Sequence, residues 1–191
     1  MNIAVLLGGV GLDAQKGTVK GILDNALPEG TNVYIFTCDG WKYESRYQYK
    51  SGEYNIYHLP DFTKYDGVII DSDSIHDAKT VEEVIAKIRE AAIPCISLGI
   101  HWDGMGCVYL ENRTGMRATA EHLIQQHDVK RIYYISGPMD SQDARERLTA
   151  YREVLGEYHL EYEERMTYYG DFSHKSGVGA LNDLLEMDMT L

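Results

Sequence analysis

The sequence predicts an α/β fold in which a parallel sheet carries helices on both faces. Short continuous apolar runs recur along the chain, and each is followed by apolar residues at helical spacing. Runs of this kind are typical of strands that are buried on both faces, as in a parallel sheet. Strand and helix patterns alternate over nearly all of the 191 residues, which favours parallel crossover connections.

The first half of the chain contains four predicted strands and two predicted helices. One helix has apolar residues at helical spacing over 14–27, and a second begins at the capping-box pair Thr80 and Glu83. Residues 41–58 break the pattern with Trp41 and five tyrosines, and we interpret them as an ordered surface excursion that covers a sheet edge or forms an interface. The predicted strands are residues 3–7, 31–37, 67–71 and 94–98.

The second half continues the alternation. A short strand at 107–110 precedes a helix for which Asn112 is a good N-cap. A strand at 131–135 precedes a helix with Asp143 and Glu146 as its capping box. The last pair is a strand at 166–169 and a helix from about Ser173, with one apolar face made by Val178, Leu181 and Leu185.

Composition and charge exclude several classes of protein. The formal net charge is −12, so we expect a polyanion such as DNA to be repelled by this chain. The three cysteines are far apart and form no CxxC pair, which fits a reducing cytosol and argues against a thiolate metal site. The N-terminal apolar run is too short for a signal peptide or a membrane span. We therefore expect a cytoplasmic protein without a metal or other cofactor.

Ligands of parallel α/β sheets bind outside the carboxyl ends of the strands, so residues that follow the strands are site candidates. Asp71, Gly99 and the pair Asp171-Phe172 stand at such positions. Arg147 borders the buried stripe of its helix close to the helix start, where a guanidinium can reach a ligand's hydroxyls or carboxylate. The alternative for Arg147 is a structural salt bridge with Asp143.

Other motifs leave further alternatives open. Gly9-Val10-Gly11 and Ala14 fit GxGxxA after the first strand, which is compatible with a nucleotide-dependent enzyme or with an ordinary flexible turn. Trp102 lies in a Gly-rich loop that either contacts a ligand or wraps over the fold. His122 and His127 are five positions apart on one helix, a spacing that does not put them on one face.

Several stretches together resemble the effector-binding domain of LacI/GalR-type regulators, whose fold is that of type I periplasmic sugar-binding proteins. VYLENRTGMRATAEHLIQQHDVKRIYYISGP (108–138) matches the family's pattern that ends in "RI..I.GP". SQDARERLTAYREVL (141–155) matches its arginine-rich helix, and YYGDFSHKSGVGALNDLL (168–185) its Gly-Asp-Phe-Ser turn. YDGVIIDSD (65–73) and IPCISL (93–98) match its third and fourth strands.

The resemblance implies two lobes, residues 1–109 and 110–191, with a small polar ligand in the cleft between them. Arg147 stands at the family's ligand-binding arginine, Phe172 at its stacking aromatic, and Asp71 faces the cleft. The remaining ligand-site candidates are Asp171, Gly9 and Trp102. Gly99 departs from the sugar binders, which often have aspartate there, so a simple hexose is not the expected ligand.

The resemblance also implies a non-enzymatic sensor that forms a homodimer through its N-terminal lobe and relays ligand binding by lobe closure to an output domain. This chain lacks the family's DNA-reading helix-turn-helix and ends early in the second lobe, so we expect a C-terminally incomplete fold with no direct nucleic acid binding and no membrane contact. Residues 43–70 also look similar to signalling proteins in which such a sensor precedes a GGDEF diguanylate cyclase. A dimerisation scaffold that binds no ligand is the remaining alternative.

Overall fold

The computed structural model describes residues 1–11, 13–26, 29–38, 52–75 and 77–187. The α/β class and the parallel sheet predicted from the sequence are confirmed. The chain folds as two compact units, Met1–Tyr109 and Leu110–Leu191.

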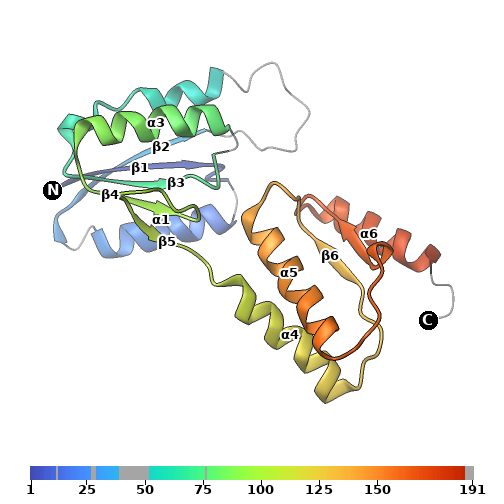
Figure 1. Cartoon of the computed structure of the whole chain (residues 1–191). Coiled ribbons are helices and arrows are strands. Elements are labelled where there is room, and N and C mark those ends of the chain that lie inside the picture. The colour runs from blue at the N-terminus through green and yellow to red at the C-terminus, as the bar shows by residue number, and fades with distance from the viewer. Residues whose placement is uncertain (12, 27–28, 39–51, 76, 188–191) are drawn as a thin grey trace. The chain divides into compact units, whose positions relative to one another are not determined.

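Unit 1 is built on a five-stranded parallel sheet in the order β2-β1-β3-β4-β5. Two helices, α1 (Asp13–Ala26) and α3 (Ala78–Ala91), lie on opposite faces of this sheet (Figure 1). Two short 3-10 helices, η2 (Tyr54–His58) and η3 (Phe62–Lys64), precede β3. The strands are β1 (Asn2–Gly8), β2 (Asn32–Cys38), β3 (Gly67–Asp71), β4 (Cys95–Leu98) and β5 (Gly106–Val108).

The core of unit 1 includes two tyrosines from the aromatic segment. Tyr54 and Tyr57 are buried among the side chains of β1, β3 and α3. The Tyr57 hydroxyl donates to the Leu7 carbonyl at 2.9 Å and lies 3.2 Å from the Cys38 sulfur, so the polar end of the ring is satisfied inside the core. The interface prediction is therefore wrong for these two tyrosines. Residues 41–51 of that segment lie outside the described residues.

Unit 2 packs two long helices against a short two-stranded parallel sheet. Helices α4 (Asn112–His127) and α5 (Gln142–Glu157) lie side by side (Figure 1), with Ala120, Ile124, Leu148 and Leu155 buried between them. The sheet pairs β6 (Tyr134–Ser136) with β7 (Thr167–Tyr169). The 3-10 helix η4 (Glu164–Met166) precedes β7, and α6 (His174–Met187) follows it.

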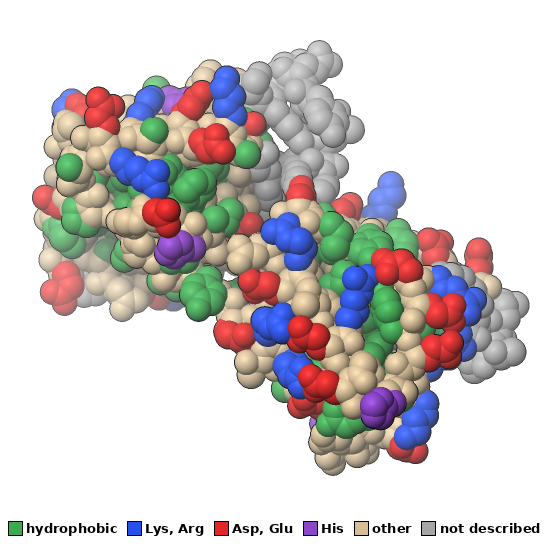
Figure 2. Space-filling model, in the orientation of Figure 1, with side chains coloured by type: hydrophobic (Ala, Val, Ile, Leu, Met, Phe, Trp, Pro, Cys, Tyr) green, Lys and Arg blue, Asp and Glu red, His purple; other side chains and the backbone are tan. Residues whose placement is uncertain are grey.

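Charged side chains line the outside of α4 and α5. Figure 2 shows basic and acidic side chains alternating there, and ion pairs join the two helices: Arg113 with Glu153 and Arg117 with Glu157, each at 2.5 Å. These ion pairs are on the protein surface, where water and salt screen them, so they contribute little to stability.

Three helices begin at other residues than the sequence predicts. The N-cap of α3 is Asp77, whose carboxylate accepts the Thr80 N–H at 2.9 Å, so Thr80 lies inside the helix. Glu111 caps α4, and Ser141 caps α5. In each case the side chain of the N-cap residue accepts the N–H three residues further along, in the first turn of the helix. Asn112 and Asp143 are thereby released from capping.

The later strands and the last helix also differ from the prediction. Strand β6 begins at Tyr134 and β5 ends at Val108, so both are shorter than their apolar runs. In α6 the buried residues are Ala180 and Leu184, because this side packs on the unit's small sheet. The predicted apolar face is wrong, since Val178, Leu181 and Leu185 are exposed. In the described part of the chain, none of the helices is long and apolar enough to cross a membrane.

Candidate functional site

Arg147 lies in the second turn of α5, where it is held by a buried asparagine. Its Nε donates to Oδ1 of Asn112 at 2.7 Å, and its Nη2 lies 3.3 Å from a carboxylate oxygen of Asp143. The Arg147 side chain keeps 35% of its surface exposed. A guanidinium has five N–H donors and these contacts use two of them, so the group is both fixed in direction and able to donate further.

Asn112 connects α4 to the start of α5. The residue is only 6% exposed, and its amide nitrogen donates to Asp143 at 2.8 Å and to Glu146 at 3.2 Å. Asn112 therefore bonds to the Arg147 guanidinium and to two carboxylates, of which Asp143 also contacts Arg147 directly. The salt bridge of Arg147 with Asp143, which the sequence offered as the alternative to a ligand role, is present within this cluster.

The cluster lies close to β6, through Tyr134. Burial raises the pKa of Tyr134 in β6, and the nearby Arg147 guanidinium opposes that rise because it favours the phenolate. The Tyr134 ring stacks on Tyr151 of α5 with centroids 5.0 Å apart, which fixes the strand against the helix. Arg147 lies near the start of α5, the helix that follows the carboxyl end of β6 after residues 137–141, and ligands of parallel sheets bind on this side.

Phe172 lies at the same strand end. A Cβ on Gly137, directly after β6, would come within 2.1 Å of Cε1 and Cζ of Phe172, so the outer end of the ring packs against the glycine. Phe172 is 57% exposed and has a φ of 65°, a left-handed conformation that costs energy in a phenylalanine. An aromatic ring that is anchored at one end and more than half exposed can stack on a ligand.

The turn that carries Phe172, residues 170–173, is stabilised by short polar bonds. The Asp171 carboxylate accepts the Ser173 N–H at 2.9 Å, and the Asp171 N–H donates to Ser176 Oγ at 3.1 Å. The Ser173 bond is the first cause of a lowered pKa for Asp171. Asp171, a ligand-site candidate in the sequence, has its carboxylate engaged in holding the turn.

In unit 1, Asp71 is the last residue of β3 and is half-buried. Burial raises its pKa to about 6, while hydrogen bonds from Ser74 lower it and the charge of Asp73 raises it further. The Ser74 N–H lies 3.3 Å from the Asp71 carboxylate, and the Ser74 hydroxyl donates to the Asp71 carbonyl at 2.8 Å. Asp71 is therefore a carboxyl group that exchanges its proton close to neutral pH.

The glycines at the end of β1, Gly8 and Gly9, allow close packing in unit 1. The Gly8 N–H donates to Ser74 Oγ at 2.9 Å, and a Cβ on Gly8 would lie 2.3 Å from the Ser74 carbonyl oxygen. The Gly9 N–H donates to the Cys38 carbonyl at 2.9 Å, with a φ of 62°. These glycines allow two strand ends to approach, and the Gly9 N–H is already bonded, which weakens the phosphate-binding interpretation of GxGxxA.

Gly99 and Trp102 contact residues that follow β3, namely Asp73 and Ser72. Gly99 has a φ of 83°, and a Cβ there would lie 2.9 Å from the Cβ of Asp73. The side chain of Asp73 therefore occupies the space where a side chain at position 99 would stand. The Trp102 indole N–H lies 3.3 Å from the Ser72 hydroxyl, and its ring packs against the core, so its loop wraps over the sheet end.

Each unit thus brings some of the sequence-predicted residues together. Arg147, Phe172 and Asp171 lie around the β6 and β7 ends of unit 2, whereas Asp71, Gly9 and Trp102 lie around the β1, β3 and β4 ends of unit 1. Sequence reasoning missed Asn112, which it assigned to a cap, and it did not foresee that Phe172 packs against Gly137. A buried amide among three charged side chains has no local signature in a sequence.

The two histidines of α4 also differ from expectation. The Nε2 atoms of His122 and His127 are 3.0 Å apart, because His127 is the last helical residue and its side chain turns back along the helix. The statement that the two do not share a face is wrong. Over the ranges that the structure describes, no group of three or more metal-ligating side chains is present.

No family model matches the sequence. The chain is similar to the HTH-type transcriptional regulator CelR of Thermobifida fusca, with 37% identity over 103 residues, which covers 52% of this chain and 30% of CelR. It is also similar to catabolite control protein A of Staphylococcus xylosus, with 22% identity over 188 residues, covering 91% of this chain and 54% of that protein. The matches thus span about a third to a half of the length of these two relatives.

Solved structures extend this likeness to the whole chain. The regulator CcpA of Lactococcus lactis has a TM-score of 0.72 at 18% identity, covering 98% of this chain and 65% of that one. A complex of CelR with cellobiose has a TM-score of 0.68 at 24% identity, covering 100% and 56%. The Lac repressor dimer bound to operator has a TM-score of 0.74 at 21% identity, covering 97% and 60%. The chain has the parallel α/β fold of LacI-type, periplasmic-binding-protein-like domains.

Proposed function

We propose that this chain is the ligand-binding module of a LacI/GalR-type regulator, and that it binds a small, uncharged, polyhydroxylated molecule without catalysing a reaction. The observation that carries the proposal is the arrangement around the β6 end. It combines a guanidinium fixed by a buried amide with an aromatic ring fixed over a glycine. The similarity to CelR and to catabolite control protein A supports the regulatory part of the proposal.

The charges around Arg147 favour an uncharged ligand. Asp143 already lies 3.3 Å from the guanidinium, and Glu146 is joined to the same cluster through Asn112. An anionic ligand would have to displace or approach these carboxylates, which costs Coulomb energy. Hydroxyl groups, in contrast, can accept from the guanidinium and donate to the carboxylates, and an apolar sugar face can stack on Phe172.

The position of Gly99 does not argue against hydroxyl recognition in unit 1. Asp73 brings a side chain to the space above Gly99, and Asp71 ends the neighbouring strand. Both carboxyl groups can accept hydrogen bonds from ligand hydroxyls. We therefore include Asp71 in the proposed ligand contacts, with Gly9 and Trp102 as supports of the surrounding backbone.

Signal relay and assembly belong to the same proposal. By the resemblance, closure of the lobes on the ligand would pass the signal to an attached output, and the chain would form a homodimer. The relatives are transcriptional regulators by name, which favours a DNA-binding output in the full protein. None of these names supports the diguanylate cyclase output, and none supports the nucleotide-dependent enzyme.

The proposal is tested by isothermal titration calorimetry with pairs of neutral and anionic sugars. Cellobiose, glucose and galactose form the neutral set, and cellobiose 6′-phosphate, glucuronate and galacturonate form the matching anionic set. We expect at least one neutral sugar to bind, with its anionic counterpart at least about tenfold weaker. Binding confined to the anionic set, or stabilisation only by NAD(P), would overturn the proposal. No binding by any of these compounds or by a wider neutral polyol set would favour the dimerisation scaffold.

A further inference from the structure

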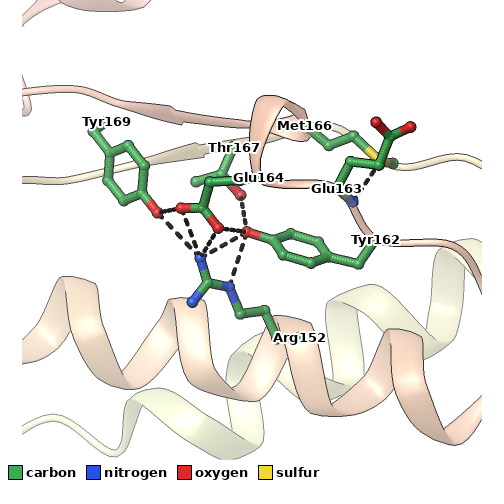
Figure 3. Close-up of polar contacts among 7 residues, drawn as sticks. All are labelled: Arg152, Tyr162, Glu163, Glu164, Met166, Thr167 and Tyr169. Carbon is green, nitrogen blue, oxygen red and sulfur yellow. Dashed lines mark hydrogen bonds and ion pairs between the residues drawn. The ribbon is translucent and has the colours of Figure 1, made fainter.

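A polar cluster lies on α5 one and a half turns beyond Arg147. Arg152, on this helix, donates from Nε and Nη2 to the Tyr162 hydroxyl at 2.9 and 2.6 Å. Its Nη2 also contacts the Glu164 carboxylate at 2.8 Å and the Tyr169 hydroxyl at 3.1 Å (Figure 3). One guanidinium thus joins α5 to the segment before β7, to η4 and to the last residue of β7.

The acceptors of Arg152 are also bonded to one another. The Tyr162 hydroxyl donates to Glu164 at 2.9 Å and lies 3.2 Å from the Thr167 hydroxyl, and the Tyr169 hydroxyl donates to Glu164 (Figure 3). These bonds lower the pKa of Glu164, the Tyr169 bond most, so the carboxylate is held in its charged form. A network of this kind is more rigid than separate surface ion pairs.

The sheet that this cluster braces is weak by itself. Strands β6 and β7 are three residues each and pair only with each other in the described part of unit 2. A two-stranded pair of this length is marginal in water and needs a further element to hold it. Tyr169 is the last residue of β7 and precedes Phe172 by three positions, so any shift of β7 moves the Phe172 turn directly.

We infer that Arg152 is a positioning residue for the ligand site: by clamping β7 to α5, it sets the place of the Phe172 ring relative to Arg147. Arg147 and Arg152 are five residues apart on one helix, or about 7.5 Å along its axis. Because both arginines are on α5, the bonds of Arg152 fix the position of the Phe172 turn relative to the helix that carries Arg147. The ligand-binding part of this inference rests on the proposed function, whereas the clamping of the turn does not.

Lysine cannot replace Arg152 fully. The guanidinium presents donors in a planar fork that reach Tyr162, Glu164 and Tyr169 together, whereas an ammonium concentrates its donors on one atom. Arg152→Lys should keep the contact with Glu164 and lose some of the hydrogen bonds to the Tyr162 and Tyr169 hydroxyls. Arg152→Met keeps the apolar stem and removes every polar contact. A matched control is Arg165→Met, because Arg165 pairs with Glu163 at 2.7 Å in the same segment but makes no bond to α5.

The first measurement is amide hydrogen exchange of the ligand-free protein. Three amides of the Phe172 turn have hydrogen-bond partners: Gly170, Asp171 and Ser173. In Arg152→Met we expect them to exchange about tenfold or more faster than in wild type, with Arg152→Lys between the two and Arg165→Met like wild type. Tyr169→Phe, which removes one hydroxyl and keeps the ring, should give a smaller change of the same sign if Arg152→Met does not fold.

The second measurement is affinity for the neutral sugar that wild type binds. We expect Arg152→Met to lose at least about fivefold and Arg165→Met to lose none. If wild type binds none of the sugars, the proposed function fails while the exchange data still decide the clamp. Exchange in the folded Arg152→Met variant within about twofold of wild type, or equal acceleration in Arg165→Met, would overturn the inference.

Discussion

Replacing Asn112 with alanine should both destabilise unit 2 and weaken ligand binding. The amide makes two short bonds to charged partners, at 2.7 Å from Arg147 and 2.8 Å to Asp143, and a longer one to Glu146. A hydrogen bond to a charged group contributes about 1.5–3 kcal/mol. Arg147 and Asp143 keep about a third of their surface exposed, so water replaces part of this, and we expect a net loss of about 2–3 kcal/mol.

The assay is urea unfolding followed by far-UV circular dichroism, together with a melting curve. For a chain of this length the loss corresponds to a fall in Tm of roughly 5–10 °C. Gln142→Ala is the control, since its exposed amide donates one bond to Glu146 at 2.8 Å, and we expect a change within about 0.5 kcal/mol. The reasoning is refuted if Asn112→Ala costs no more than Gln142→Ala.

The remaining predictions concern single residues near the strand ends. Burial raises the pKa of Asp71 from 3.8 to about 6, so the stability that this carboxyl group contributes is present at low pH and is lost as the pH rises through that range. The stability of Asp71→Asn relative to wild type should therefore grow between about pH 4 and pH 7 and reach a gain of about 1–3 kcal/mol at pH 7.5 in urea titrations, and a variant less stable than wild type at pH 7.5 would contradict this. Gly99→Ala should cost about 1–3 kcal/mol more than Gly104→Ala in the same assay, because both have positive φ but only position 99 meets the Asp73 side chain; equal costs would disprove the steric argument. Gly137→Ala should displace the Phe172 ring and reduce sugar affinity at least about tenfold while the protein stays folded, and unchanged affinity would remove Phe172 from the site.

Much of the fold could be predicted, because the spacing of apolar residues and the length of the apolar runs distinguish strands from helices. The runs at 3–7 and 67–71 are strands β1 and β3, whose side chains are buried between helices on two faces. The ends of β5 and β6 could not be predicted, because an apolar run shows what can pair, whereas the neighbouring strand decides how far pairing extends. The buried side of α6 could not be predicted for the same reason. It is set by packing on the two-stranded sheet of β6 and β7, which the local sequence of the helix does not show.

The candidate site was partly visible in the sequence for a similar reason. Helical periodicity puts Arg147 beside the buried stripe of α5, and the strand-end rule points to Asp71 and Phe172. The partner of Arg147 was not visible, since Asn112 is 35 positions away and reaches α5 only through the packing of two helices. The packing of Phe172 on Gly137 is equally long-range, and no local pattern encodes it.

The central claim is that the Arg147 guanidinium binds the ligand, and it is tested most directly by titrating the best-bound neutral sugar into Arg147→Met and Arg145→Met. Arg145 is two residues away on α5 and donates to the Met139 carbonyl instead, so it controls for loss of charge on the same helix. We expect Arg147→Met to bind at least about thirtyfold more weakly, with Arg145→Met within about threefold of wild type. Undiminished binding by a folded Arg147→Met variant would contradict the account.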